Sequence, residues 1–193
     1  YLYDRKAEWG PSYFDARHIL NFTHIYELPF GRGRAWGADM PGIAQAIFGS
    51  WTLSGNLTLR SGFPLTMRGP DNSGTLARGA RADRIGTGGT LGQVGRGSRW
   101  FDTSAYAIPR AGTLGSAGNG TERGPGLATY NLSVQKEFPI KERLGMEFRA
   151  EFFNLTNTPQ FNGPNRSVNS PNFGEIVSAQ GERVTQLALR LYF

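Results

Sequence analysis

The feature that most constrains this chain is a strict alternation of apolar and polar residues, which recurs in several long segments. In the last of them Leu187, Leu189 and Leu191 alternate with mostly polar neighbours, and the chain ends on Phe193. A period of two places successive side chains on opposite faces of a β-strand. Each segment therefore has one apolar and one polar face, and the pattern predicts an all-β, antiparallel fold.

Five such segments predict five strands. We expect them near residues 17–29, 50–64, 127–138, 143–156 and 183–193. Strands of soluble proteins have about 5 or 6 residues, whereas a tilted strand that crosses a bilayer needs about 9 to 11. The polar faces carry charges and amides, which suits a water-filled lumen, and the apolar faces favour Leu and aromatic residues, which suits lipid. A soluble sandwich or barrel is the alternative, although its core would favour Val and Ile.

The connections between these segments differ strongly in length. Only "PIKERLG" joins the third segment to the fourth, whereas residues 68–126 separate the second from the third. Loops longer than about 15 residues are uncommon in compact soluble domains. Short turns on one rim and long loops on the other are typical of outer-membrane barrels. We therefore expect an up-and-down transmembrane β-barrel, with 68–126 as a long outer loop and the protein in the outer membrane of a Gram-negative bacterium.

Aromatic residues gather where the two rims of such a barrel would lie, as expected for membrane–water interfaces. The expected periplasmic rim holds Tyr26, Phe30, Trp36, Trp51, Phe138, Tyr192 and Phe193. The outer segments hold Tyr13, Phe14, Phe63, Trp100 and Phe101. The stretch "SRWFDTSAY" has two interpretations, a packed loop or a patch that contacts a ligand.

The sequence offers little for catalysis or metal binding. It has no cysteine, and its two histidines, His18 and His24, are too far apart along one strand to share a metal. Glu147 and Glu151 stand roughly 13 Å apart by strand rise, beyond the roughly 5 to 9.5 Å of a glycosidase pair. Arg149 between them indicates an ion ladder. We expect no enzyme activity and no cofactor or metal.

The net charge is +6, but the basic residues are spread along the chain without a cluster, so we expect no nucleic-acid partner. The candidate lumen-facing contacts, to a solute or to a plug domain, are Arg60, Glu147, Arg149, Glu151 and Arg190. The candidate contacts in the outer loop are Trp100, Phe101, Arg78, Arg81 and Arg84. Arginine forks suit phosphate oxygens, so lipopolysaccharide is a candidate partner of the loop arginines.

Several stretches resemble the C-terminal barrel end of TonB-dependent outer-membrane transporters of the Oar-like type. The stretches "FDARHILNFTHIYELPFG", "WTLSGNLTLRSGFPLT" and "YNLSVQKEF" carry the resemblance, and "AEFFNLTNTPQF" with "GEIVSAQGERVTQLALRLYF" is its most specific part. The family implies a barrel of about 22 strands with a plugged lumen. It also implies a carboxypeptidase-regulatory-like domain on the N-terminal side.

The resemblance implies uptake or binding of a bulky solute without chemistry on it. An outer-membrane adhesion barrel that binds a protein or matrix partner through its long loops is the alternative. Because five strands cannot close a barrel, we expect the chain to be a fragment that lacks the plug and N-terminal domains. The TonB complex would act through those missing parts. The resemblance also makes Phe193, with Leu191, Leu189 and Leu187, the expected signal for the barrel-assembly machinery.

Overall fold

The computed structural model describes residues 6, 8–76, 80–141 and 144–193. The chain forms two compact units, each assembled from separate stretches of sequence. Unit 1 consists of Tyr1–Ile19, Arg60–Leu127 and Gln160–Gln180, and unit 2 consists of Leu20–Leu59, Ala128–Pro159 and Gly181–Phe193.

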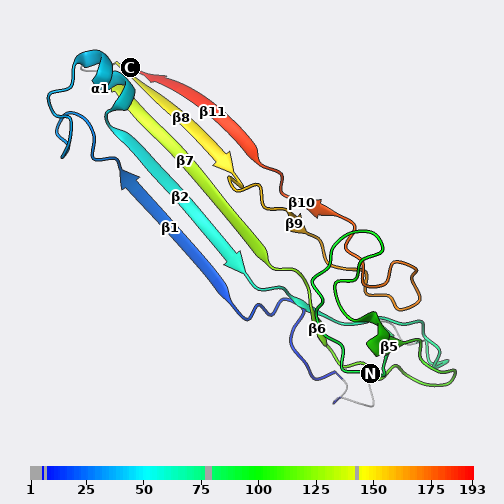
Figure 1. Cartoon of the computed structure of the whole chain (residues 1–193). Coiled ribbons are helices and arrows are strands. Elements are labelled where there is room, and N and C mark those ends of the chain that lie inside the picture. The colour runs from blue at the N-terminus through cyan, green and yellow to red at the C-terminus, as the bar shows by residue number, and fades with distance from the viewer. Residues whose placement is uncertain (1–5, 7, 77–79, 142–143) are drawn as a thin grey trace. The chain divides into compact units, whose positions relative to one another are not determined.

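Unit 2 is built on one five-stranded sheet with the strand order β1-β2-β7-β8-β11 (Figure 1). The strands are β1 (Ile19–Glu27), β2 (Trp51–Arg60), β7 (Leu127–Pro139), β8 (Gly145–Phe153) and β11 (Val184–Tyr192). Strand β8 pairs antiparallel with β7 on one side and with β11 on the other. The prediction of an all-β fold with antiparallel strands is confirmed, and β1 and β11 form the two edges of the sheet.

Strands β2 and β8 end three or more residues before the expected positions, 64 and 156. Strand β2 stops at Arg60, and Pro64–Leu65 forms the separate short strand β3 of unit 1. Strand β8 stops at Phe153 because Asn154 has a positive φ of 49°, and its side-chain amide donates to the carbonyl oxygen of Thr158 at 2.9 Å. Asn tolerates this left-handed conformation better than most residues, so "NLTN" forms a turn. Residue 143 lies outside the described residues.

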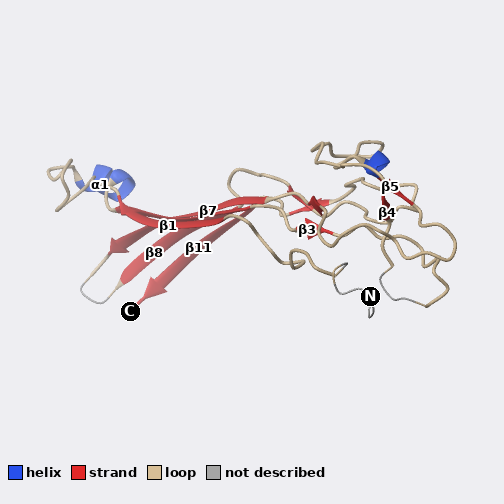
Figure 2. Ribbon diagram, turned by 90° about the horizontal axis from the view of Figure 1, so that it is seen from below, coloured by secondary structure: helices blue, strands red, loops and turns tan. Residues whose placement is uncertain are grey.

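A short helix that the sequence did not predict, α1 (Gly42–Phe48), lies between β1 and β2 at one end of the sheet (Figure 2). The indole Nε1 of Trp51 donates to the carbonyl oxygen of Ile47 at 2.8 Å. The ammonium group of Lys136 donates to the carbonyl oxygen of Gln45 at 3.0 Å. Both contacts hold the C-terminal turn of α1 against the sheet. In the described part of the chain, no helix has the length and apolar character needed to cross a bilayer.

Unit 1 contains the long segment 68–126, whose described residues, 68–76 and 80–126, take part in a folded unit. The short strands of unit 1 are β3, β4 (Asp83–Arg84), β5 (Tyr106–Ala107), β6 (Glu122–Arg123), β9 (Gln160–Phe161) and β10 (Ala179–Gln180). They pair antiparallel as β3 with β6, β4 with β5 and β9 with β10. A single 3-10 turn, Thr103–Ala105, precedes β5.

An aromatic core holds unit 1 together. Phe101 packs edge-to-face against Phe173, with ring centroids 5.3 Å apart, and both rings contact Tyr106. Met67 and Ala82 complete the centre of this cluster and are fully buried. Aromatic pairs of this kind contribute about 0.5–1.5 kcal/mol beyond the area they bury. Unit 1 therefore has a hydrophobic core of its own.

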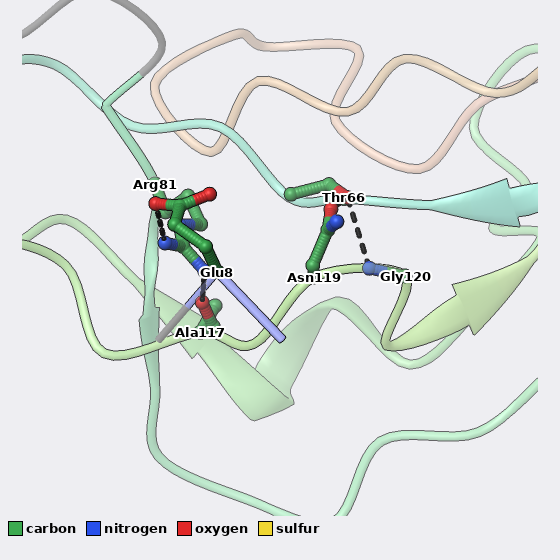
Figure 3. Close-up of polar contacts among 6 residues, drawn as sticks. All are labelled: Glu8, Thr66, Arg81, Ala117, Asn119 and Gly120. Atoms are coloured by element: carbon green, nitrogen blue, oxygen red, sulfur yellow. Dashed lines mark hydrogen bonds and ion pairs between the residues drawn. The ribbon is translucent and has the colours of Figure 1, made fainter. Parts of the chain in front are cut away.

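Two sets of polar contacts link separate stretches of unit 1 (Figure 3). One joins Arg81 to Glu8 of the N-terminal stretch, and the other joins Thr66 to residues 119 and 120. The Arg81 guanidinium donates to the Glu8 carboxylate at 2.5 Å and to the carbonyl oxygen of Ala117 at 3.2 Å. The Thr66 hydroxyl donates to the Asn119 side chain at 2.5 Å and accepts from the backbone N–H of Gly120 at 2.9 Å.

Candidate functional site

The polar face of the sheet forms ordered rows across β7, β8 and β11. The rows are Ser133–Glu151–Gln186, Gln135–Arg149–Ala188 and Glu137–Glu147–Arg190, in the order β7, β8, β11. Four of the five expected lumen-facing residues, all but Arg60, therefore share this face. The register brings them together because residues two apart on a strand point the same way.

The expected ion ladder is present along β8. The Arg149 guanidinium lies 2.5 Å from the Glu147 carboxylate and 3.8 Å from that of Glu151. Glu137 stands directly opposite Glu147, and like charges in that position repel each other. Arg149 and, across the other strand pair, Arg190 supply positive charge beside these carboxylates. The polar face thus carries many charges, and its positive and negative charges nearly cancel.

The opposite face of the same strands is apolar. Its rows are Leu132–Phe152–Thr185, Val134–Ala150–Leu187, Lys136–Phe148–Leu189 and Phe138–Met146–Leu191. Leu187, Leu189 and Leu191 of the edge strand β11 are more than half exposed, and Phe193 is 99% exposed. Lys136 is the one charged residue in these rows, and its ammonium group is turned to the carbonyl oxygens of Gln45 and Gly49.

The aromatic residues expected at the periplasmic rim lie near the ends of strands. Tyr26 is next to the last residue of β1, Trp51 is the first of β2, Phe138 is next to the last of β7 and Tyr192 is the last of β11. Since neighbouring strands are antiparallel, these positions fall at one end of the sheet, where α1 also lies. The arrangement is that of an interfacial aromatic belt.

A cavity of about 520 Å³ opens in unit 1. Its lining combines three aromatic residues, two arginines and backbone from glycine and proline positions: Tyr13, Arg60, Phe63, Pro64, Leu65, Gly124, Pro125, Phe161, Asn162, Gly163, Pro164, Arg166 and Gln180. No acidic residue is among these lining residues. Its volume falls within the roughly 300–1,000 Å³ of small-molecule sites.

Arg60, the fifth expected lumen-facing residue, lines this cavity. Its guanidinium carbon stacks 3.9 Å from the centroid of the Phe63 ring. The Nε–H of Arg60 is buried and finds no hydrogen-bond acceptor in the part of the chain that the structure describes. A buried donor left without an acceptor costs about 1–3 kcal/mol. Arg60 is thus held in place by an aromatic ring with part of its hydrogen-bonding capacity unused.

Arg166 is the second cation of the cavity and is partly buried. Burial, followed by the charge of Arg68, lowers the pKa of the Arg166 guanidinium from its ordinary value. Both effects disfavour the charged form. A guanidinium nevertheless stays protonated in proteins, so the cavity carries positive charge that no acidic residue among its lining residues compensates.

Most of the residues expected to contact a ligand from the outer loop are internal to unit 1. Phe101 is 0% exposed, so the packed-loop interpretation of "SRWFDTSAY" holds for it. The indole of Trp100 donates to the carbonyl oxygen of Arg123 at 2.7 Å. Arg81 is buried and paired with Glu8. The prediction that Phe101 and Arg81 are surface contacts is therefore wrong, and both residues are structural. Arg84 is exposed and donates to the carbonyl oxygens of Gly86 and Thr87. Arg78 lies outside the described residues.

No group of three or more metal-binding side chains occurs within residues 6, 8–76, 80–141 and 144–193. The Nε2 atom of His24 instead lies 2.9 Å from the hydroxyl oxygen of Tyr130. The cavity and Arg166 were not predicted from the sequence. The one local sequence feature that could have indicated the cavity is "RSGF", in which Arg60 and Phe63 stand three residues apart next to the end of a strand.

Long antiparallel strands with one charged and one apolar face are the structure of a membrane β-barrel wall. In agreement with this, the family model described as "Outer membrane beta barrel domain" matches residues 1–186. The chain belongs to this family, and the protein is located in the bacterial outer membrane. No curated protein and no solved structure matches the chain.

Proposed function

We propose that the protein is a TonB-dependent receptor of the Oar-like type, which takes up a bulky solute and performs no chemistry on it. The observation that carries this proposal is the charged polar face, centred on Arg149, on a sheet whose other face is apolar. Such a sheet contributes a water-filled lumen, through which a solute passes, and a lipid-facing wall. The sequence resemblance supplies the energised mechanism, which would act through a plug and N-terminal domains.

An adhesion barrel is the second candidate. Unit 1 leaves several large apolar residues at least half exposed, namely Ile85, Leu91, Ile108 and Val177. Exposed apolar side chains that gather into a patch mark sites of contact with other proteins. On this alternative unit 1 would bind a protein or matrix partner, and nothing would pass through the barrel.

Uptake and adhesion are separated by measuring what the full-length protein removes from the medium. Gram-negative cells with and without the protein would be grown in a defined solute mixture, and the remaining solutes quantified, with and without an uncoupler of the inner membrane. Uptake predicts that specific solutes disappear only in energised cells that carry the protein. Unchanged solute levels together with stronger attachment to a matrix-coated surface would favour adhesion.

We further propose three partners in the membrane. Lipid covers the apolar rows, lipopolysaccharide phosphates bind exposed arginines such as Arg84 and Arg110, and the barrel-assembly machinery recognises the exposed end of β11. Phe193→Asp should therefore lower the amount of heat-modifiable barrel in outer membranes, whereas Asp39→Asn, at an exposed site outside the strands, should not. Equal amounts of folded barrel in the Phe193 variant and the wild type would refute the role of β11 as a signal. Charge reversal of Arg84 and Arg110 that left lipopolysaccharide co-purification unchanged would refute the arginine contacts.

A further inference from the structure

The arginines of unit 1 fall into two groups that differ in how their charge is balanced. Arg81, Arg99 and Arg123 pair with the carboxylates of Glu8, Glu175 and Asp15. Arg60 and Arg166, which line the cavity, form no ion pair with any described residue. An uncompensated charge in a partly buried site is unfavourable and is normally paired. The contrast within one unit therefore marks the cavity as a place where negative charge is missing.

The surroundings of the Arg60 guanidinium indicate what kind of anionic group would neutralise its charge. The ring of Phe63 covers one face of its guanidinium, which leaves the edge of the group to form hydrogen bonds. The buried Nε–H on that edge has no acceptor in the described part of the chain. Carboxylate and phosphate oxygens accept from the Nε and Nη atoms of an arginine as a bidentate pair. Both anions share the chemistry that this edge requires.

We propose that the cavity of unit 1 binds an anionic solute, whose carboxylate or phosphate group is held between Arg60 and Arg166. The rings of Tyr13, Phe63 and Phe161 line the same space and offer contacts to an apolar or planar part of the solute. The volume of about 520 Å³ accommodates a small organic molecule. This inference rests on the proposed function as a solute receptor and adds the charge class of the solute.

The test uses two dyes with the same ring system and opposite charge. Fluorescein is anionic and rhodamine 6G is cationic, and the binding of each to the full-length protein in detergent would be followed by fluorescence anisotropy. We expect saturable binding of fluorescein, weakened by about tenfold or more in Arg60→Gln and in Arg166→Gln, because each loses a charge-assisted hydrogen bond. Arg17→Gln is the matched control, since it removes the same charge from an exposed site outside the cavity.

Two further arms sharpen the result. Arg60→Lys keeps the charge but loses the bidentate edge, so it should bind fluorescein with intermediate affinity. This variant also serves if Arg60→Gln fails to give a heat-modifiable barrel. Competition by benzoate and by phenyl phosphate distinguishes a carboxylate site from a phosphate site.

Several outcomes would overturn the inference: no saturable binding of fluorescein, equal binding of both dyes, or equal losses in Arg60→Gln and Arg17→Gln. The outcome is separable from that of the proposed function. Arginine-dependent dye binding without energised uptake would refute the transporter and leave the anion site standing. Energised uptake of solutes without dye binding would support the transporter and refute the anion site.

Discussion

The ammonium group of Lys136 in β7 donates a hydrogen bond to the carbonyl oxygen of Gly49, 2.5 Å away, where helix α1 ends. It also donates to Gln45 in the last turn of the helix. The last carbonyls of a helix have no partner within the helix and carry partial negative charge. Lys136, although it stands in an apolar row of the sheet, thus supplies both hydrogen bonds and complementary charge to α1.

Replacing this lysine should loosen the connection between β1 and β2. Lys136→Met keeps most of the apolar stem but leaves the carbonyl oxygen of Gly49 without its Lys136 donor, whereas that of Gln45 still accepts from the backbone N–H of Gly49. This should destabilise the folded protein by about 1–3 kcal/mol. The expected result is a lower midpoint of thermal unfolding in detergent. Lys141→Met, at an exposed position just after β7, is the matched control and should leave the midpoint unchanged. Equal midpoints for the two variants would contradict a role for Lys136 at α1.

The ion ladder makes a prediction about charge on the polar face. Arg149→Gln should lower the free energy of unfolding by about 1 kcal/mol or less. The reason is that the Arg149 side chain is 43% exposed and water screens its ion pairs. Arg149→Glu should cost more, since it adds a fourth carboxylate to Glu137, Glu147 and Glu151. The destabilisation of the Glu variant should shrink in high salt. The measurement is the unfolding midpoint of each variant at low and high ionic strength.

A charge exchange provides the control for the ladder. The double variant Glu147→Arg/Arg149→Glu keeps the net charge and places the pair in reverse order. It should recover most of the stability lost in Arg149→Glu alone. Failure to recover it, or a loss in Arg149→Glu that salt does not change, would show that packing of Arg149 matters and its charge does not.

The long strands could be predicted from the sequence because alternation is a local property that each strand displays by itself. The rows of Glu147, Arg149 and Glu151 followed from the same periodicity. The cavity could not be predicted in this way, because Arg60 and Arg166 are far apart in the sequence and meet only when unit 1 folds. Helix α1 was missed because its seven residues are too few to show a helical period. Phe101 and Arg81 looked like loop residues because turn-rich sequence around them hides a core that only long-range pairing creates.

Tyr106 gives unit 1 a predicted dependence on high pH. Its hydroxyl donates to the Glu122 carboxylate at 2.9 Å, and the Thr121 hydroxyl lies at the same distance from it. Burial, with a smaller contribution from Glu122, raises the pKa of Tyr106 from 10.0 to about 12. The folded state thus favours the neutral phenol. The stability that results is fully present below pH 10, and it is lost as the pH rises from 10 through 12.

The measurement is the ultraviolet absorbance of phenolate during an alkaline titration of the folded protein. We expect one phenol that titrates near pH 12 in the wild type and that is missing in Tyr106→Phe. Tyr13→Phe, which alters an exposed tyrosine, should retain this late phase. A late phase that persists in Tyr106→Phe would contradict the assignment.

Strand β8 of a membrane barrel has one face toward water and one toward lipid, and the accessibility of single cysteines along it measures this difference. This chain has no cysteine of its own. Single cysteines would be placed at residues 147 to 152 of the full-length protein, with any cysteines elsewhere replaced, and treated with a membrane-impermeant maleimide in outer-membrane vesicles opened by freeze–thaw. We expect labelling at positions 147, 149 and 151, on the polar face, and protection at positions 148, 150 and 152, on the apolar face. Uniform labelling, or labelling with the opposite alternation, would contradict it.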